Sequence, residues 1–224
     1  MSPTKQRFHF GCDIDSTANN WEGQGSPLFK IWKKKFPNLE FLGSKRSSEY
    51  EISQNYPEEY REKIIDIYKH PQLGFFRNMP PMMGVQKALS ELSKFGTITM
   101  VSTAISASFF DLRDTKERRR YNHFLLQCIR EKVEWVEEHI APALEHMPEM
   151  VFVTDKSTFS GHVLIDDNPH VVTNCKYKPT WTHVLYDEGY LWNKNTENKF
   201  RVKWTDPDCT ETILKIAQCN QFMK

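Results

Sequence analysis

Long apolar runs, a strong charge of one sign and paired cysteine motifs are all missing from this sequence. No apolar run approaches the roughly 20 residues that cross a bilayer, and no signal-peptide core precedes the first apolar segment at 8–14. The 30 Lys and Arg residues nearly balance the 29 Asp and Glu residues, and the net charge of +1 gives no strong field to attract nucleic acid or an anionic membrane. The five cysteines are odd in number, widely spaced and without a Cys-x-x-Cys pair, which is typical of free thiols in a reducing compartment. We therefore expect a soluble cytoplasmic protein with no membrane partner and no dependence on nucleic acid.

Apolar periodicity predicts strands and helices in alternation along the chain. We expect strands at 8–14, 97–101, 150–154, 162–165 and 182–186, and helices at 19–36, 57–68, 84–94, 122–139 and 210–221. Such alternation is typical of an α/β protein with a parallel sheet and helices on both faces.

The stretch after the first strand differs in character from the rest. Residues 38–80 are rich in Tyr, Glu, Ser and Pro and show no strand pattern, which predicts a small helical cap inserted after the first strand. We therefore expect a core of residues 1–18 and 81–224 and a cap region of residues 19–80. The charged residues 106–122 are expected to form a loop.

Two carboxylates, Asp13 and Asp15, end the first strand. Residues two apart in an extended strand point to the same face, which would bring both to one site at the carboxyl edge of the sheet, where open α/β sheets bind their ligands. Two like charges so close repel each other. Either a bound cation or a shared proton would relieve the repulsion.

Three further apolar runs also end in polar groups, at Ser102/Thr103, at Lys156 and at Asp166/Asp167. Together they would place carboxylates, an ammonium and hydroxyls around one crevice. Oxygen ligands without a His or Cys cluster favour a hard cation, Mg²⁺ above all. This set suits phosphoryl transfer, in which one carboxylate forms an aspartyl-phosphate and another moves a proton.

Four motifs of this chain resemble those of haloacid dehalogenase (HAD)-type phosphatases: Asp-Ile-Asp-Ser-Thr at 13–17, Val-Ser-Thr at 101–103, Asp-Lys-Ser at 155–157 and Ile-Asp-Asp-Asn-Pro at 165–169. Further stretches are similar to the cytosolic and mitochondrial 5'(3')-deoxyribonucleotidases, namely 132–136, 154–167, 181–186 and the region of 202–216. The resemblance runs through nearly the whole chain. It implies a HAD-like Rossmannoid α/β fold with a cap, and it leaves a homodimer open.

The resemblance also implies roles for individual residues. Asp13 would be the nucleophile and a metal ligand. Asp15 would be the general acid/base, and its backbone carbonyl would also bind the metal. Lys156 would neutralise both the phosphate and the nucleophile, and Asp166 and Asp167 would hold Mg²⁺ directly or through water.

Ser102, Thr103 and Lys132 would bind the phosphate according to the same resemblance. The nucleobase would lie in an aromatic pocket made by Trp21, Phe75 and Phe76. Two positions depart from the family pattern: Ser16 stands where a glycine is usual, and Thr154 where an arginine is common.

Each of these residues also has a purely structural interpretation. Asp13/Asp15 and Asp166/Asp167 could be solvated turns, and Ser102 or Thr103 could cap a helix. The aromatic residues could equally belong to the core. The charged run 117–120 fits a solvated helical face, with a nucleic-acid contact as the alternative.

The leading interpretation is a Mg²⁺-dependent phosphatase that hydrolyses (deoxy)nucleoside monophosphates to nucleoside and phosphate through an aspartyl-phosphate on Asp13. The resemblance favours a pyrimidine deoxyribonucleotide as the substrate. Two alternatives stay open: a HAD phosphatase that acts on another small phosphate ester or on a polynucleotide 3' end, and a catalytically silent nucleotide-binding protein.

Overall fold

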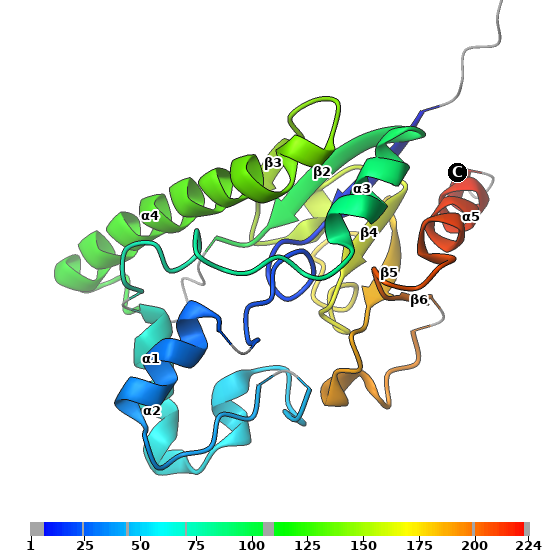
Figure 1. Cartoon of the computed structure of the whole chain (residues 1–224). Coiled ribbons are helices and arrows are strands. Elements are labelled where there is room, and N and C mark those ends of the chain that lie inside the picture. The colour runs from blue at the N-terminus through cyan, green and yellow to red at the C-terminus, as the bar shows by residue number, and fades with distance from the viewer. Residues whose placement is uncertain are drawn as a thin grey trace, which may run out of the picture.

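A six-stranded parallel sheet with the strand order β3-β2-β1-β4-β5-β6 forms the centre of the molecule (Figure 1). The computed structural model describes residues 7–23, 25–43, 45–69, 71–104, 110–198 and 200–221. The strands are β1 (Phe8–Cys12), β2 (Gly96–Ser102), β3 (Glu149–Phe152), β4 (Val163–Asp166), β5 (Thr182–Tyr186) and β6 (Arg201–Val202). The α-helices are α1 (Pro27–Lys35), α2 (Glu58–Lys69), α3 (Val85–Ser93), α4 (Thr115–His139) and α5 (Cys209–Gln221). The fold is therefore α/β, as predicted.

The register of the sheet brings the polar strand ends to one edge. Cys12, the last residue of β1, pairs with Met100 of β2 and with Ile165 of β4. The side chains of these three residues are fully buried, because helices or loops cover both faces of a parallel sheet. The residues that follow β1, β2 and β4 consequently emerge close together.

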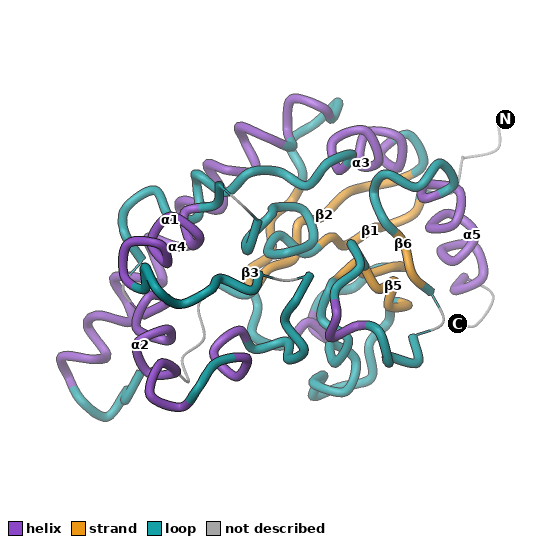
Figure 2. The backbone as a smooth tube through the Cα atoms, turned by 60° about the horizontal axis from the view of Figure 1, so that its bottom comes forward, coloured by secondary structure: helices purple, strands orange, loops and turns teal. Residues whose placement is uncertain are grey.

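In the part of the chain that the structure describes, α3, α4 and α5 lie on one face of the sheet, whereas the sequence predicted helices on both faces. Buried residues of α3, α4 and α5 join one cluster with Phe8, Phe10 and Cys12 of β1. A smaller cluster around Phe159 and Leu164 covers the opposite face. Figure 2 shows the helices along one side of the sheet and mostly loops along the other.

Two connections without an α-helix explain this asymmetry. The links 153–162 and 167–181 cross the second face, and they contain turns and a 3₁₀ helix, η4 (Lys156–Thr158). The link 153–162 has fewer residues than the dozen or more that a helical crossover needs, and the link 167–181 forms turns instead of a helix, so both cover the sheet as loops. Gly11 permits the close packing, because a Cβ atom at this position would lie 2.5 Å from Cε1 of Phe159.

Between β1 and α3 the chain forms α1, α2 and the 3₁₀ helix η1 (Ile52–Asn55). Ser26 caps α1 by accepting a hydrogen bond from Phe29 N at 3.1 Å, and Pro27 stands at the first helical position. Trp32 of α1 packs its ring 4.6 Å from that of Tyr56, centroid to centroid. In Figure 1, α1 and α2 lie beside each other, away from α5.

Most predicted boundaries differ from the structure by one or two residues, and the starts of α1 and α4 differ by more. The first strand ends at Cys12 rather than at residue 14, and α1 begins at Pro27 rather than at residue 19. α4 begins at Thr115 rather than at residue 122, because Asp114 accepts hydrogen bonds from the amides of residues 116 and 117 and caps an earlier start. Residues 106–109 of the predicted charged loop lie outside the described residues.

The short strand β6 was not predicted, because two residues give no detectable alternation. Within the described ranges, the helices are too short or too polar to span a membrane.

Candidate active site

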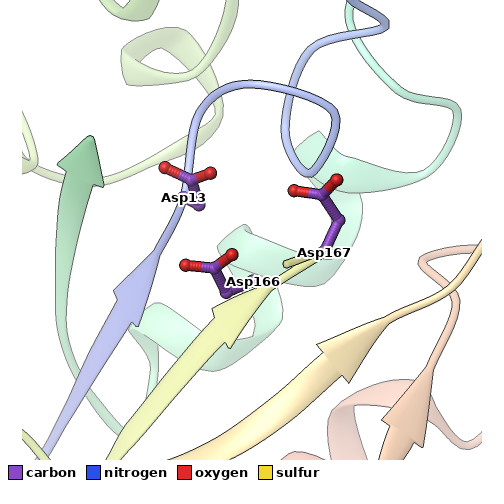
Figure 3. Close-up of side chains that lie close together, drawn as sticks. All are labelled: Asp13, Asp166 and Asp167. Carbon is purple, nitrogen blue, oxygen red and sulfur yellow. The ribbon is translucent and has the colours of Figure 1, made fainter. Parts of the chain in front are cut away.

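Three buried carboxylates lie together at the carboxyl ends of β1 and β4: Asp13, Asp166 and Asp167 (Figure 3). One oxygen from each lies within 4.8 Å of the others. Asp13 directly follows β1, Asp166 ends β4, and Asp167 follows it. The neighbouring strand ends therefore produce this cluster, as the sequence predicted for these three residues.

Lys156 supplies positive charge to the cluster. Its Nζ lies 2.9 Å from Asp13 Oδ1 and 2.5 Å from Asp166 Oδ2. Burial alone would lower the pKa of Lys156, but attraction by Asp13 and then by Asp166 outweighs this effect and raises the pKa above its ordinary value. The side chain is 11% exposed, so the ammonium is held inside the site as a cation.

Three carboxylates sharing this ammonium leave an excess of negative charge. Burial, and then repulsion by Asp166 and Asp15, raises the pKa of Asp13 to about 7, although Lys156 opposes the shift. Burial, followed by repulsion from Asp166 and Asp13, raises the pKa of Asp167 well above its ordinary value. A divalent cation would remove the repulsion that drives these shifts.

The donor set fits a hard cation. Asp167 Oδ1 accepts a hydrogen bond from Thr17 Oγ1 at 3.2 Å, whereas its Oδ2 is buried and has no hydrogen-bond partner among the described residues. A buried carboxylate oxygen without a donor is costly unless something else binds it. Oxygen atoms of this kind are the ligands that Mg²⁺ and Ca²⁺ prefer.

Asp15 occupies a turn after β1, and different partners hold it. Its Oδ2 lies 2.5 Å from Lys132 Nζ, and its Oδ1 accepts a hydrogen bond from Asn19 Nδ2 at 3.2 Å. The strand-alternation argument for Asp13 and Asp15 was wrong, because β1 ends at Cys12. The turn nevertheless brings both carboxylates to the same cavity.

Lys132 of α4 connects Asp15 to the end of β2. Its side chain is only 1% exposed, and its Nζ donates to Ser102 Oγ at 3.0 Å and to the Thr103 carbonyl at 2.7 Å. Burial lowers the pKa of Lys132 when taken alone, but the carboxylate of Asp15 contributes to a net rise. The predicted phosphate-binding residues Ser102, Thr103 and Lys132 are thus brought together.

Ser16 has φ of 55°, the only positive φ at a non-glycine position in the described part of the chain. This left-handed conformation disfavours residues with a Cβ atom. Tyr190 donates from its hydroxyl to the Ser16 carbonyl at 2.8 Å, and Trp204 Nε1 donates to the Thr17 carbonyl at 2.7 Å. These contacts hold the turn in this conformation despite the Cβ atom of Ser16.

A cavity of about 180 Å³ opens between these groups. Its lining includes Asp13, Asp15, Thr103 and Lys156. Ser102 Oγ is buried in the contact with Lys132 beneath this surface. The cavity therefore offers two carboxylates, an ammonium and a hydroxyl to one ligand.

The aromatic residues Trp21, Phe75 and Phe76 also form a group, with ring centroids 5.1–5.6 Å apart. Phe75 and Phe76 are almost completely buried, and Lys132 Nζ lies 5.3 Å from the centroid of the Phe76 ring. Trp21 lines a second cavity, of about 190 Å³. Phe75 and Phe76 thus pack beneath Trp21 as core residues.

Glu131 anchors this aromatic segment to α4. Its carboxylate accepts hydrogen bonds from the amides of Gly74 at 2.7 Å and Phe76 at 2.9 Å. Sequence reasoning missed this residue, because a Glu in a charged helix gives no sign that it is buried.

Sequence reasoning also missed several cavity residues from distant segments. Tyr50 lines both cavities, and Glu51 and Trp192 line the second. Tyr50 is 42% exposed as a residue, yet its hydroxyl faces the interior, where burial and then the carboxylates of Asp167 and Asp166 raise its pKa well above the ordinary value. Only the fold brings these positions next to the aspartates.

The chain matches the family model of 5' nucleotidase, deoxy (pyrimidine), cytosolic type C protein over residues 12–219. A protein of Bordetella bronchiseptica named "Putative 5'(3')-deoxyribonucleotidase" is 29% identical over 173 residues, which are 77% of this chain and 80% of the relative. The mitochondrial 5'(3')-deoxyribonucleotidase of Mus musculus is 25% identical over 178 residues, 78% of this chain and 70% of the relative.

The crystal structure of a haloacid dehalogenase-like family hydrolase from Xanthomonas campestris is a distant likeness, with a TM-score of 0.41 and 11% identity over 97% of this chain and 99% of that one. The family match covers most of the chain and includes all four strand-end motifs. The chain belongs to the family of 5' nucleotidase, deoxy (pyrimidine), cytosolic type C proteins and is a phosphoric monoester hydrolase of the 5'(3')-deoxyribonucleotidase type.

Proposed function

We propose that this protein is a Mg²⁺-dependent nucleotidase that hydrolyses (deoxy)nucleoside monophosphates to nucleoside and phosphate. The observation that carries the proposal is the placement of Asp13. Its carboxylate lies at the centre of a buried cluster that suits a cation, beside the Lys156 ammonium and within the cavity that Asp15 also lines.

Asp13 would attack the phosphorus atom of the substrate. A bond forms between its carboxylate oxygen and phosphorus as the bond to the nucleoside oxygen breaks, which gives an aspartyl-phosphate. Lys156, 2.9 Å from Asp13, would attract the phosphoryl oxygens and hold the nucleophile in place.

Asp15 would move the proton. It would protonate the leaving nucleoside oxygen and then take a proton from the water that hydrolyses the aspartyl-phosphate. Lys132 and Asn19 hold this carboxylate from two sides. The ammonium of Lys132, together with Ser102 and Thr103, would bind the phosphate oxygens of the substrate.

Asp13, Asp166, Asp167 and the backbone carbonyl of Asp15 would hold Mg²⁺. The cation, when bound, would offset the negative charge that the phosphate and the carboxylates bring together. Asp167 Oδ2, which has no hydrogen-bond partner among the described residues, supports this assignment.

We also propose that residues 19–80 act as a cap over a catalytic core of residues 1–18 and 81–224, with Trp21 facing the nucleoside and Phe75 and Phe76 supporting it.

The cysteines are free thiols, which agrees with a cytoplasmic site of action.

The test is the variant Asp13→Asn, which keeps the size of the side chain and removes the nucleophile. We expect phosphate release to fall at least about a thousandfold, with the melting temperature retained. The control is Asp66→Asn, a carboxylate 49% exposed in a surface pair with Lys35, which should keep full activity. An Asp13→Asn protein that hydrolyses nucleotides at the rate of the unchanged protein would refute the mechanism.

A further inference from the structure

The second cavity, of about 190 Å³, extends from the carboxylates toward the cap. It shares Asp15 and Tyr50 with the cavity beside Asp13. Together the two spaces reach the size of typical small-molecule sites, roughly 300 Å³ or more, which neither reaches alone. A nucleotide with its phosphate at Asp13 would therefore place its nucleoside end here.

Flat apolar walls and several carboxylates line this space. The rings of Tyr50 and Trp192 lie 5.8 Å apart at an interplanar angle of 89°, and Trp21 and Ile52 add to the lining. Aromatic walls suit stacking on any nucleobase and do not by themselves select one. Selectivity must come from the polar groups that reach the edge of the base.

Glu51 is the polar group best placed for this task. Among the described residues its carboxylate is met by Ser53, through the hydroxyl at 3.5 Å and the backbone amide, and it has no cationic partner there. Three further carboxylates line the cavity: Asp15 and Asp167 belong to the aspartate site, and Glu22 is buried to 9% exposure. Trp192 Nε1 is a buried donor without a hydrogen-bond partner in the described ranges. The cavity thus presents an acceptor and a donor that a ligand could satisfy.

We propose that Glu51 makes this site selective for a guanine base over thymine or uracil. An ionised carboxylate only accepts hydrogen bonds, and it has two oxygens to accept them. Guanine offers two adjacent N–H donors on one edge, at N1 and at the 2-amino group. Thymine and uracil offer one N–H between two carbonyl oxygens, which the carboxylate would repel. Adenine and cytosine offer an amino group next to an acceptor nitrogen.

This inference rests on the proposed nucleotidase function and narrows its substrate class. It also departs from the pyrimidine preference that the family resemblance suggests. The reason for this departure lies in the cavity itself. A buried polar group discriminates between bases more strongly than an apolar wall does, because the wrong base leaves that group unpaired.

The experiment compares kcat/KM for dGMP, dTMP, dUMP, dAMP and dCMP in the unchanged protein, in Glu51→Gln and in a control, Glu49→Gln. Glu49 is exposed and two residues away, so its variant should keep the profile of the unchanged protein. Burial raises the pKa of Glu51, and the assays are therefore run at pH 8 to keep the carboxylate ionised.

We expect the unchanged protein to prefer dGMP. Glu51→Gln should lower kcat/KM for dGMP about tenfold to a hundredfold, mostly through KM. In the same variant, kcat/KM for dTMP should stay level or rise, because the side-chain amide of the new glutamine can donate a hydrogen bond to a carbonyl of thymine. The fall for dGMP should also exceed any change for p-nitrophenyl phosphate, which has no base.

A preference for dTMP or dUMP in the unchanged protein, or an equal loss for every nucleotide in Glu51→Gln, would overturn the inference. Absence of phosphate release from all nucleotides and from p-nitrophenyl phosphate would refute the proposed function instead. In that case, equilibrium binding to the Asp13→Asn variant tests the role of Glu51 without catalysis. Tighter binding of dGMP than of dTMP that is lost in Asp13→Asn/Glu51→Gln would uphold this role. Equal binding of the two nucleotides would overturn it.

Discussion

Lys132 offers a prediction with a matched control in the same chain. Its side chain is 1% exposed, and its ammonium donates hydrogen bonds to Asp15, to Ser102 Oγ and to the Thr103 carbonyl. Lys215 forms an equally short pair with Glu211, 2.6 Å between Nζ and Oε1, but both side chains are more than two-thirds exposed. The two lysines differ mainly in burial, so the same substitution at each tests what burial contributes.

Lys132→Met would remove the ammonium that donates to Asp15 Oδ2, to Ser102 Oγ and to the Thr103 carbonyl. Breaking a buried pair in this way costs about 3–5 kcal/mol. The Asp15 side chain keeps 29% exposure and can be partly hydrated, which places the expected loss near the lower limit, about 3 kcal/mol. Lys215→Met should leave the free energy of unfolding almost unchanged, because solvent screens an exposed pair.

Urea denaturation at pH 7 and 25 °C measures the free energy of unfolding of both variants. Because the folded pKa of Lys132 is raised, its stabilising contribution is complete below the ordinary lysine pKa of 10.5 and is lost only as the pH rises through the raised value. The result should therefore not change between pH 7 and pH 9. The double variant Lys132→Met/Asp15→Asn should recover at least about 1 kcal/mol, since it removes the unpaired charge. Equal losses for Lys132→Met and Lys215→Met would refute the reasoning.

Three further predictions concern the turn after β1, the aromatic segment and the cation site. Ser16→Gly should stabilise the fold by about 0.5–1 kcal/mol, because φ of 55° suits glycine; a lower melting temperature would contradict this. Glu131→Gln should lower the free energy of unfolding by about 1–3 kcal/mol, because the new amide nitrogen would face the backbone N–H of Gly74 or of Phe76. An unchanged urea denaturation curve would show that Glu131 does not anchor the aromatic segment. Without metal, the contribution of Asp13 to stability should fall as the pH rises from 3.8 toward 7, since its folded pKa is raised. Protons compete with the cation for Asp13, so Mg²⁺ should raise the melting temperature more at pH 8 than at pH 5.5 in a thermal-shift assay, and an equal shift at both would contradict the site.

The sequence predicted the sheet and the strand-end groups because these depend on local patterns. An apolar run followed by Asp13, or by Asp166 and Asp167, marks a strand and its end without knowledge of the rest of the chain. The parallel pairing then places those ends together. The orientation of Asp15 could not be predicted in this way, because one turn separates it from the strand.

Features that depend on packing between distant segments were not predictable from the sequence. Glu51 and Trp192 meet at one cavity although 140 residues separate them along the chain, and Glu131 is buried only because the loop at 74–76 binds it. The one-sided placement of the helices depends on how the short links 153–162 and 167–181 cover the second face. No periodicity in those links indicates which face they cross.

The central claim is that the buried aspartates support Mg²⁺-dependent release of phosphate from a nucleotide. The most direct measurement is phosphate release from 5' and 3' ribo- and deoxyribonucleoside monophosphates, with Mg²⁺ and with EDTA, by the unchanged protein and by Asp13→Asn. We expect Mg²⁺-dependent release from one or two deoxynucleotides that disappears both in EDTA and in Asp13→Asn. Release that persists in EDTA or in Asp13→Asn, or nucleotide binding without any release, would contradict the account.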